Sequence, residues 1–217
     1  GLHFEKLNNI QVWHDEVVVY KVLDKDKDYV GLLYQDLHPR PTKRGGAWMN
    51  QLQAQGMKSG VIEEPHVTFN CNMTRASGDT PALLSVNEVK TVFHEFGHCL
   101  HGLLTNVKYK SLGAMSVYWD FVELPSQILE NWLSEPDVLN LFGSHYKTGE
   151  KIPSEYIEKL NKSKKFMGGT HSLRQLHLCK IDMAWHDVDS QSGNVEDFEK
   201  ELLDKYTVLP RVEGAVV

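Results

Sequence analysis

The sequence predicts an α+β fold that is mostly helical and carries a small β-sheet. Strand-like apolar runs occur within the first 80 of the 217 residues. After Ser85 the spacing of apolar residues changes from two to between three and four. Most later segments keep that helical spacing. We therefore expect a sheet-rich part over residues 1–80 and a helical part over residues 81–217.

The predicted strands come first along the chain. Residues 16–23, EVVVYKVL, and 29–37, YVGLLYQDL, are rich in β-branched and aromatic residues, and a polar turn separates them. This pattern predicts an antiparallel hairpin. Residues 38–50 contain the Pro and Gly typical of a loop. Residues 66–73, HVTFNCNM, alternate between apolar and polar, which predicts a third strand. Its apolar face comprises Val67, Phe69, Cys71 and Met73.

The predicted helices follow the third strand. Ser85 and Glu88 have the spacing of a capping box, which marks the start of a helix. Apolar residues then fall at positions 86, 89, 93, 96, 100 and 103, as one buried stripe of a helix requires. Further helices are expected at about 120–134, 137–147, 154–165, 171–187 and 195–206.

Composition and charge argue against some classes of partner. Hydrophobic residues make up 41% of the chain and charged residues 24%, which is typical of a globular protein. The net charge of −6 argues against nucleic acid as a partner. No apolar run approaches the ~18 residues that span a membrane, and no secretory leader is recognised, so no membrane partner is expected. The three widely spaced cysteines favour reduced thiols and a cytoplasmic location.

A candidate metal site lies in the segment TVFHEFGHCLHG, residues 91–102. His94 and His98 are one helical turn apart and about 40° apart around the axis, so both imidazoles can converge on one ion. Glu95 flanks that face and is placed to act as a base on a metal-activated water. His101 lies about 10 Å along the axis from His94, which favours a packing role. The alternative is a polar helix face without metal.

A catalytic zinc site needs a third protein ligand. In one class the motif continues H-x-x-G-x-x-H, but here those last positions hold His101 and Leu104. In the other class the third ligand is a glutamate from a following helix. Glu123, at the start of FVELPSQILENW, fits because Pro125 places it near a helix N-terminus. Glu130 is the rival ligand, for which surface exposure is favoured.

These residues resemble those of a known family. FHEFGHCLHGLL followed by DFVELPSQILENW is similar to the thimet oligopeptidase and dipeptidyl carboxypeptidase family of zinc metallopeptidases. RGGAWM upstream and HYKTGEKIP downstream are also similar, and the resemblance is closest to the bacterial dipeptidyl carboxypeptidase and oligopeptidase A branch. By position, the resemblance implies that His94, His98 and Glu123 bind one zinc ion and that Glu95 is the general base. One local departure is Trp119, where many relatives have arginine.

The resemblance also implies a fold and a function. It implies a zincin-type catalytic lobe and the hydrolysis of short peptides, either internally or by release of C-terminal dipeptides. Family members are much longer, so the chain is expected to be a fragment of a larger helical peptidase, weak or inactive alone and prone to self-association. We expect substrate to pair with the strand at 66–73, and Asp120 and Gln127 to orient ligands or cap helices. The alternatives are a non-catalytic, peptide-binding metal module and a structural metal site that uses cysteine.

Overall fold

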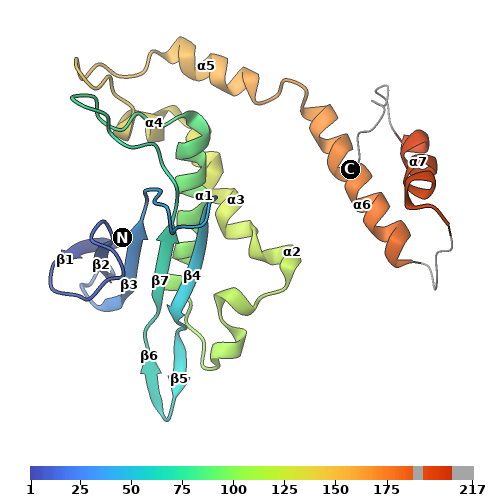
Figure 1. Ribbon diagram of the computed structural model, residues 1–217. Coiled ribbons are helices and arrows are strands. Elements are labelled where there is room, and N and C mark those ends of the chain that lie inside the picture. Colours follow the sequence, from blue (N-terminus) through green and yellow to red (C-terminus); the bar gives the residue numbers. More distant parts are fainter. Residues whose placement is uncertain (188–192, 207–217) are drawn as a thin grey trace. The chain divides into compact units, whose positions relative to one another are not determined.

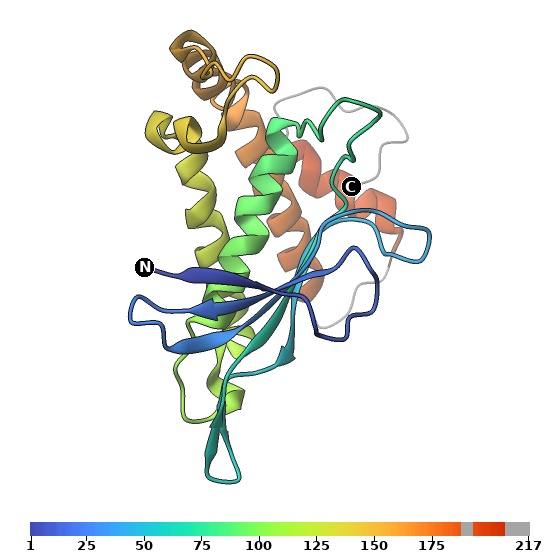
Figure 2. The same ribbon diagram turned by 90° about the vertical axis from the view of Figure 1, so that its left-hand side faces the viewer.

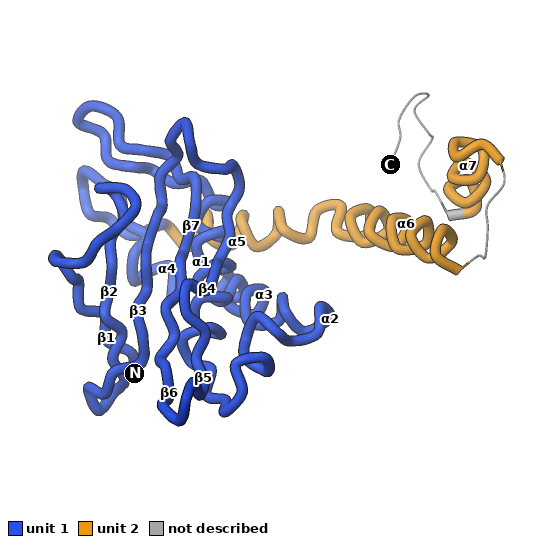
Figure 3. Tube along the Cα trace, turned by 60° about the horizontal axis from the view of Figure 1, so that its bottom comes forward, with its two compact units in different colours: residues 1–152 blue, residues 153–217 orange. Residues whose placement is uncertain are grey.

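The computed structural model describes residues 1–187 and 193–206 and confirms the α+β class (Figure 1). The chain divides into two compact units, residues 1–152 and 153–217 (Figure 3). The first unit holds the described strands and the helix with the HEFGH segment. No helix in the described ranges is long and apolar enough to cross a membrane.

The first unit is built on a five-stranded sheet with the order β1-β2-β3-β7-β4. Only the β3–β7 pair is parallel; the other pairs are antiparallel. Two short strands form a separate hairpin. The strand bounds are β1 His3–Leu7, β2 Val18–Leu23, β3 Tyr29–Asp36, β4 Trp48–Gln53, β5 Gly56–Lys58, β6 Val61–Glu63 and β7 His66–Asn70.

The predicted hairpin is confirmed by the antiparallel pairing of β2 with β3. The third predicted strand is also confirmed, although its regular pairing ends at Asn70, and all four residues of its predicted apolar face are buried. Residues 38–50 were predicted as a loop, yet β4 begins at Trp48. The sequence of β4, WMNQLQ, is half polar, and its apolar residues do not share one buried face: Met49 is buried, whereas Leu52 is 56% exposed. Backbone pairing with β7 therefore defines this strand.

The helix that carries the motif is α1, Val86–Leu103. The predicted capping box is confirmed: the Ser85 side chain accepts from the backbone of Glu88, and the Glu88 side chain accepts from the backbone of Ser85. The later helices are α2 Trp119–Val122, α3 Leu124–Glu130, α4 Pro136–Phe142, α5 Ser154–Ser163, α6 Gly168–His186 and α7 Val195–Tyr206, with short 3₁₀ turns at Lys110–Leu112, Ala114–Ser116 and Asn131–Ser134.

Two helix predictions are corrected. The expected helix at 120–134 is interrupted at Glu123, because Pro125 begins a new helix rather than continuing the old one. The expected helix at 137–147 stops at Phe142, and Ser144 pairs with Lys151 across a turn.

The main core lies between α1 and one face of the sheet (Figure 2). Cys99 and Leu103 of α1 pack there with buried residues of β2, β3, β4 and β7. The predicted stripe is partly wrong: Phe93 packs against Phe142 instead of the sheet. Phe142 belongs to α4, and α3 covers another side of α1, so the contact surface of α1 is wider than one stripe that faces the sheet.

Candidate metal centre

The helix α1 presents two imidazoles side by side. His94 and His98 lie one turn apart, and their ring centroids are 5.0 Å apart with an interplanar angle of 83°. Both side chains are mostly shielded, with 26% and 11% of their surface exposed. Burial lowers the pKa of His98, which favours the neutral imidazole that a metal ion requires.

Glu123 reaches both histidines from the next helix. It is the N-cap residue of α3, and Pro125 lies in the first turn, as predicted. Its Oε2 atom lies 3.3 Å from Nε2 of His94 and 3.2 Å from Nε2 of His98. The structure therefore brings together the three residues that the sequence singled out as ligands, and their ligand atoms all lie within 4.8 Å of one another.

This spacing can be compared with that of a zinc site. For tetrahedral zinc with bonds of about 2.0–2.1 Å, two ligand atoms lie about 3.3–3.4 Å apart. The two nitrogen–oxygen distances here, 3.3 and 3.2 Å, are close to that value. Two imidazoles and one carboxylate are also the donor set of catalytic zinc sites that keep one position open. The residues present thus fit a metal ion that has access to solvent or substrate.

A glycine allows the two helices to come this close. A Cβ atom on Gly97 would lie 2.5 Å from the carbonyl oxygen of Pro125 and 2.6 Å from Cα of Ser126. Both atoms belong to the backbone of α3, so no side-chain rotation could relieve the contact. Gly97 therefore permits the approach that places Glu123 opposite the histidines.

Two further residues hold the ligands, and neither was predicted in this role. The Ser126 hydroxyl is 2.8 Å from both Oε2 and the backbone oxygen of Glu123, to which it can donate. Glu130, considered as a rival ligand, instead lies 2.8 Å from Nδ1 of His94, on the other side of the ring from the ligand atoms. Asp120, for which helix capping was the alternative, lies in the first turn of α2, and both Asp120 and Gln127 are exposed. The sequence signal for the Ser126 contact was its spacing, because Ser126 follows Glu123 by three residues.

Glu95 is buried beside the histidine pair, with 7% of its surface exposed. Burial raises the pKa of its carboxyl group; His94 opposes this rise, and the nearby carboxylate of Glu123 adds to it. Together with His94, Glu130 and Ala47, Glu95 lines a hollow of about 290 Å³. A carboxyl group with a raised pKa in such a hollow is suited to proton transfer.

Cys99 does not face the histidines. Its thiol points towards the backbone oxygen of Thr68 in the sheet, at 3.9 Å. Burial raises the pKa of the Cys99 thiol. Burial also raises the pKa of the Cys71 thiol, to about 12. Since a thiol must lose its proton to bind zinc, the geometry and these pKa shifts both disfavour a cysteine-containing metal site.

Comparison with known protein families shows which family this chain belongs to. The model described as peptidase family M3 matches residues 1–215. The chain belongs to peptidase family M3.

Individual relatives agree with this membership. The M3 chain is 39% identical to oligopeptidase A of Salmonella typhimurium over 89% of its own length and 29% of that protein. It is 36% identical to dipeptidyl carboxypeptidase of the same organism, over 94% of its own length and 30% of that protein. Saccharolysin of Saccharomyces cerevisiae is 43% identical over 82% of the chain and 26% of saccharolysin. The chain thus spans less than a third of the length of these relatives.

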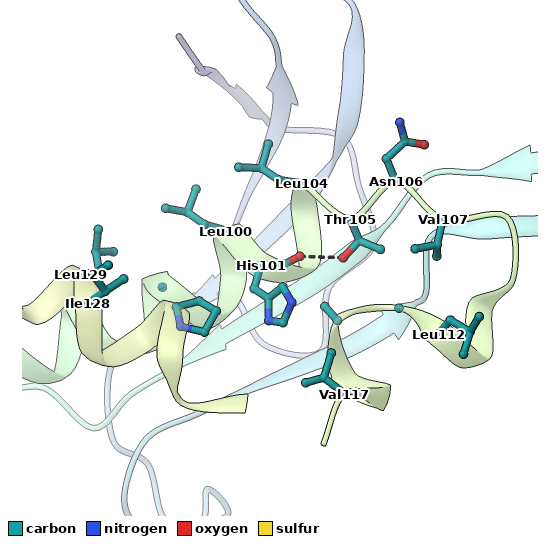
Figure 4. Close-up of a pocket in the computed structure, with 14 residues that line it drawn as sticks. Leu100, His101, Leu104, Thr105, Asn106, Val107, Leu112, Val117, Ile128 and Leu129 are labelled. Carbon is teal, nitrogen blue, oxygen red and sulfur yellow. Dashed lines mark hydrogen bonds between the residues drawn. The ribbon is translucent and has the colours of Figure 1, made fainter. Parts of the chain in front are cut away.

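His101 has the packing role that its position in the motif predicts. In this M3 chain its ring lies 6.0 Å from that of Phe121, edge to face. It also lines an apolar hollow of about 460 Å³, together with Leu100 and Leu104 of α1 and Ile128 of α3 (Figure 4).

The expected substrate strand is corrected by the sheet order. β7 pairs with β3 on one side and with β4 on the other, so its edges are not available to a peptide. Within the described residues, the free edge on this side of the sheet belongs to β4. The first residue before β4, Ala47, lines the same hollow as Glu95.

Proposed function

We propose that this M3-family chain forms the zinc-binding part of a peptidase that hydrolyses peptide bonds in short peptides. One zinc ion per chain is held by His94, His98 and Glu123, and Glu95 is the general base. The observation that carries the proposal is the convergence of two Nε2 atoms on one Glu123 oxygen at 3.2 and 3.3 Å. The names of the relatives, oligopeptidase A and dipeptidyl carboxypeptidase, support short peptides as the substrate class.

The proposed mechanism divides the work between the metal and the chain. When bound, zinc supplies Lewis-acid chemistry, which makes water more acidic and polarises a carbonyl group. Glu95 accepts the proton of the attacking water and then delivers it to the leaving amine. The position of Glu95 suits both steps, because its carboxyl group lines the hollow beside His94.

The peptide backbone is proposed to pair with the free edge of β4. Adding a strand to a sheet edge satisfies the backbone donors and acceptors of an extended peptide and does not depend on its side chains. Because Ala47 at the start of β4 lines the hollow that contains Glu95, a peptide on this edge would pass close to the proposed base.

The alternative is a peptide-binding metal module that does not catalyse hydrolysis. Such a module needs the three ligands and the strand edge, but it does not need a buried carboxyl group beside the histidines. Glu95 therefore favours the enzyme. We also propose a cytoplasmic location, which the free thiols of Cys71, Cys99 and Cys179 support.

Replacement of His94 tests the metal site. In a polypeptide of the relatives' length that contains these residues, we expect His94→Ala to remove both zinc and peptidase activity, because a site with two remaining ligands holds the metal far more weakly. The matched control is His171→Ala, which replaces an exposed helical histidine in α6. Zinc content by elemental analysis and cleavage of a quenched short peptide are the measurements. Stoichiometric zinc in His94→Ala would show that the ligand assignment is wrong.

A further inference from the structure

The two ring nitrogens of His94 face two different carboxylates. Nε2 lies 3.3 Å from Glu123 and belongs to the group of ligand atoms. Nδ1 lies 2.8 Å from Oε1 of Glu130, the last residue of α3. A carboxylate only accepts hydrogen bonds, so the proton in the second contact must be on Nδ1. In the neutral ring this leaves the lone pair on Nε2, where the ligand atoms converge.

Glu130 is itself held in place. Its other oxygen, Oε2, lies 2.9 Å from the ammonium nitrogen of Lys90, which is one helical turn before His94 on α1. Only 19% of the Glu130 side chain is exposed, against 54% for Lys90. The carboxylate is thus clamped between two side chains of α1, and each of its oxygens has one partner.

We propose that Glu130, held by Lys90, is a positioning residue that fixes His94 with its proton on Nδ1 and so presents Nε2 to the metal. This proposal rests on the proposed function, because it concerns the same metal centre. Hydrogen bonds of this kind orient the ring and raise the basicity of the ligand nitrogen. Glu130 does not touch the metal or the substrate in this arrangement, so its effect passes through His94.

Zinc affinity, measured by competition with a chromophoric chelator, tests the proposal without relying on activity. We expect Glu130→Ala to weaken zinc binding by about 10–100-fold, the usual cost of losing such a partner. Glu130→Gln keeps an oxygen acceptor for Nδ1 and should recover part of the loss. The matched control is Glu155→Gln, because Glu155 pairs with Lys159 in α5 and both are well exposed. It should bind zinc like the wild type.

Lys90 is tested by a double-mutant cycle. Lys90→Met should weaken zinc binding less than Glu130→Ala does, since the acceptor stays but loses its clamp. In the Glu130→Ala background the same change should have no further effect, because Lys90 acts only through Glu130. The control is Lys159→Met in α5. Additive losses from the two changes would overturn the role of Lys90.

A spectroscopic measurement separates positioning from general stability. With zinc bound at Nε2, the Nδ1 proton of His94 should give a slowly exchanging, downfield imidazole resonance. That resonance should persist in Glu155→Gln and disappear in Glu130→Ala. Wild-type zinc affinity in Glu130→Ala, together with zinc loss in His94→Ala, would overturn the positioning role and leave the metal site intact. Retention of zinc in His94→Ala would instead overturn the proposed metal site itself.

Discussion

Glu95 is the residue on which the choice between an enzyme and a binding module depends. Glu95→Gln preserves the size of the side chain but removes the base. In a polypeptide of the relatives' length that contains these residues, we expect nearly normal zinc content, because Glu95 is not a proposed ligand, and turnover lower by ~10²–10⁴. The measurements are zinc stoichiometry and kcat with a short peptide, and Glu5→Gln, at an exposed position of β1, is the control. A wild-type kcat in Glu95→Gln would remove the role proposed for this residue.

At the residue scale, the sequence predicted which side chains would meet but not how they are held. His94 and His98 follow from spacing, because a helix places positions four apart on one face. Glu123 follows from the proline two residues later, which indicates the start of the next helix, and from the resemblance to the family. Glu130 and Ser126 could not be assigned in this way. Their contacts depend on the rotation of α3 about its axis, and the break at Glu123 makes that rotation independent of the preceding helix.

The contact between α1 and α3 is the element-scale feature that brings the proposed metal ligands together. Gly97→Ala adds a methyl group that must displace the α3 backbone, at a cost of about 1–3 kcal/mol for overpacking. The gain in helix propensity, about 1 kcal/mol, opposes this cost but does not restore the position of Glu123. We therefore expect weaker zinc binding as well as lower stability.

Gly169→Ala is the matched control for that prediction. Gly169 also lies in a helix, and a Cβ atom there would meet nothing within 4 Å. Chelator competition and urea unfolding should show wild-type zinc affinity and equal or greater stability for Gly169→Ala. If Gly97→Ala also bound zinc like the wild type, close approach of the helices would not be what positions Glu123.

A buried ion cluster at the end of β3 determines how the sheet responds to acid. Asp36 accepts hydrogen bonds from Arg40 at 2.8 Å, Lys43 at 2.9 Å and Trp13 at 3.0 Å. Lys43 also donates to the backbone oxygen of Cys71, which follows β7. Burial alone would raise the pKa of Asp36, but the hydrogen bonds from Arg40, Lys43 and Trp13 outweigh it and hold the pKa well below its usual range.

The sign of the pH dependence follows from that lowered pKa. The contribution of Asp36 to stability is fully present above its unfolded pKa of about 3.9, and it is lost as pH falls towards the folded pKa. Asp36→Asn should cost about 3–5 kcal/mol at pH 7, because buried cationic partners lose their counter-ion. The variant should then lose less stability than the wild type on acidification below about pH 4.

Urea unfolding at a series of pH values measures this difference. Glu16 and Glu88, whose pKa values are lowered to about 2 by the Arg75 side chain and by the backbone of Ser85 respectively, titrate in the same range. Their contributions are common to both proteins, so the comparison isolates Asp36. Asp26→Asn replaces an exposed carboxylate and should leave the curve unchanged. Parallel curves for Asp36→Asn and the wild type would contradict the prediction.

The boundaries of helices and strands could be predicted only where a local sequence pattern determines them. The start of α1 could be predicted because a capping box is a local pattern. The strand β4 could not, because its identity comes from pairing with β7, a distant segment of the chain, and half of its own side chains are polar. The same long-range pairing made the 66–73 strand an interior strand and moved the free edge to β4.

At the scale of the whole molecule, the α+β class was predictable because the apolar period changes once along the chain. The exposure of large apolar side chains on the surface could not be predicted in the same way. Large apolar side chains are exposed in the first unit, among them Leu112 at 67%, Trp119 at 93% and Leu141 at 82%. Exposed apolar surface of this extent is typical of regions that contact other protein surfaces. We therefore expect residues 1–217 alone to self-associate with rising concentration, as sedimentation velocity can measure.

The final prediction concerns the activity of residues 1–217 alone. The chain spans less than a third of its relatives, and it carries the proposed ligands and base. Resemblance to the family implies that further segments contact the substrate and the developing oxyanion, and loss of one oxyanion donor typically costs ~10²–10³ in kcat. Surrounding structure also strengthens metal binding. We expect a weakly occupied zinc site and little or no cleavage of a short peptide. The comparison is with a polypeptide of the relatives' length that contains these residues, at the same added zinc. Equal kcat/KM would show that residues 1–217 are catalytically sufficient.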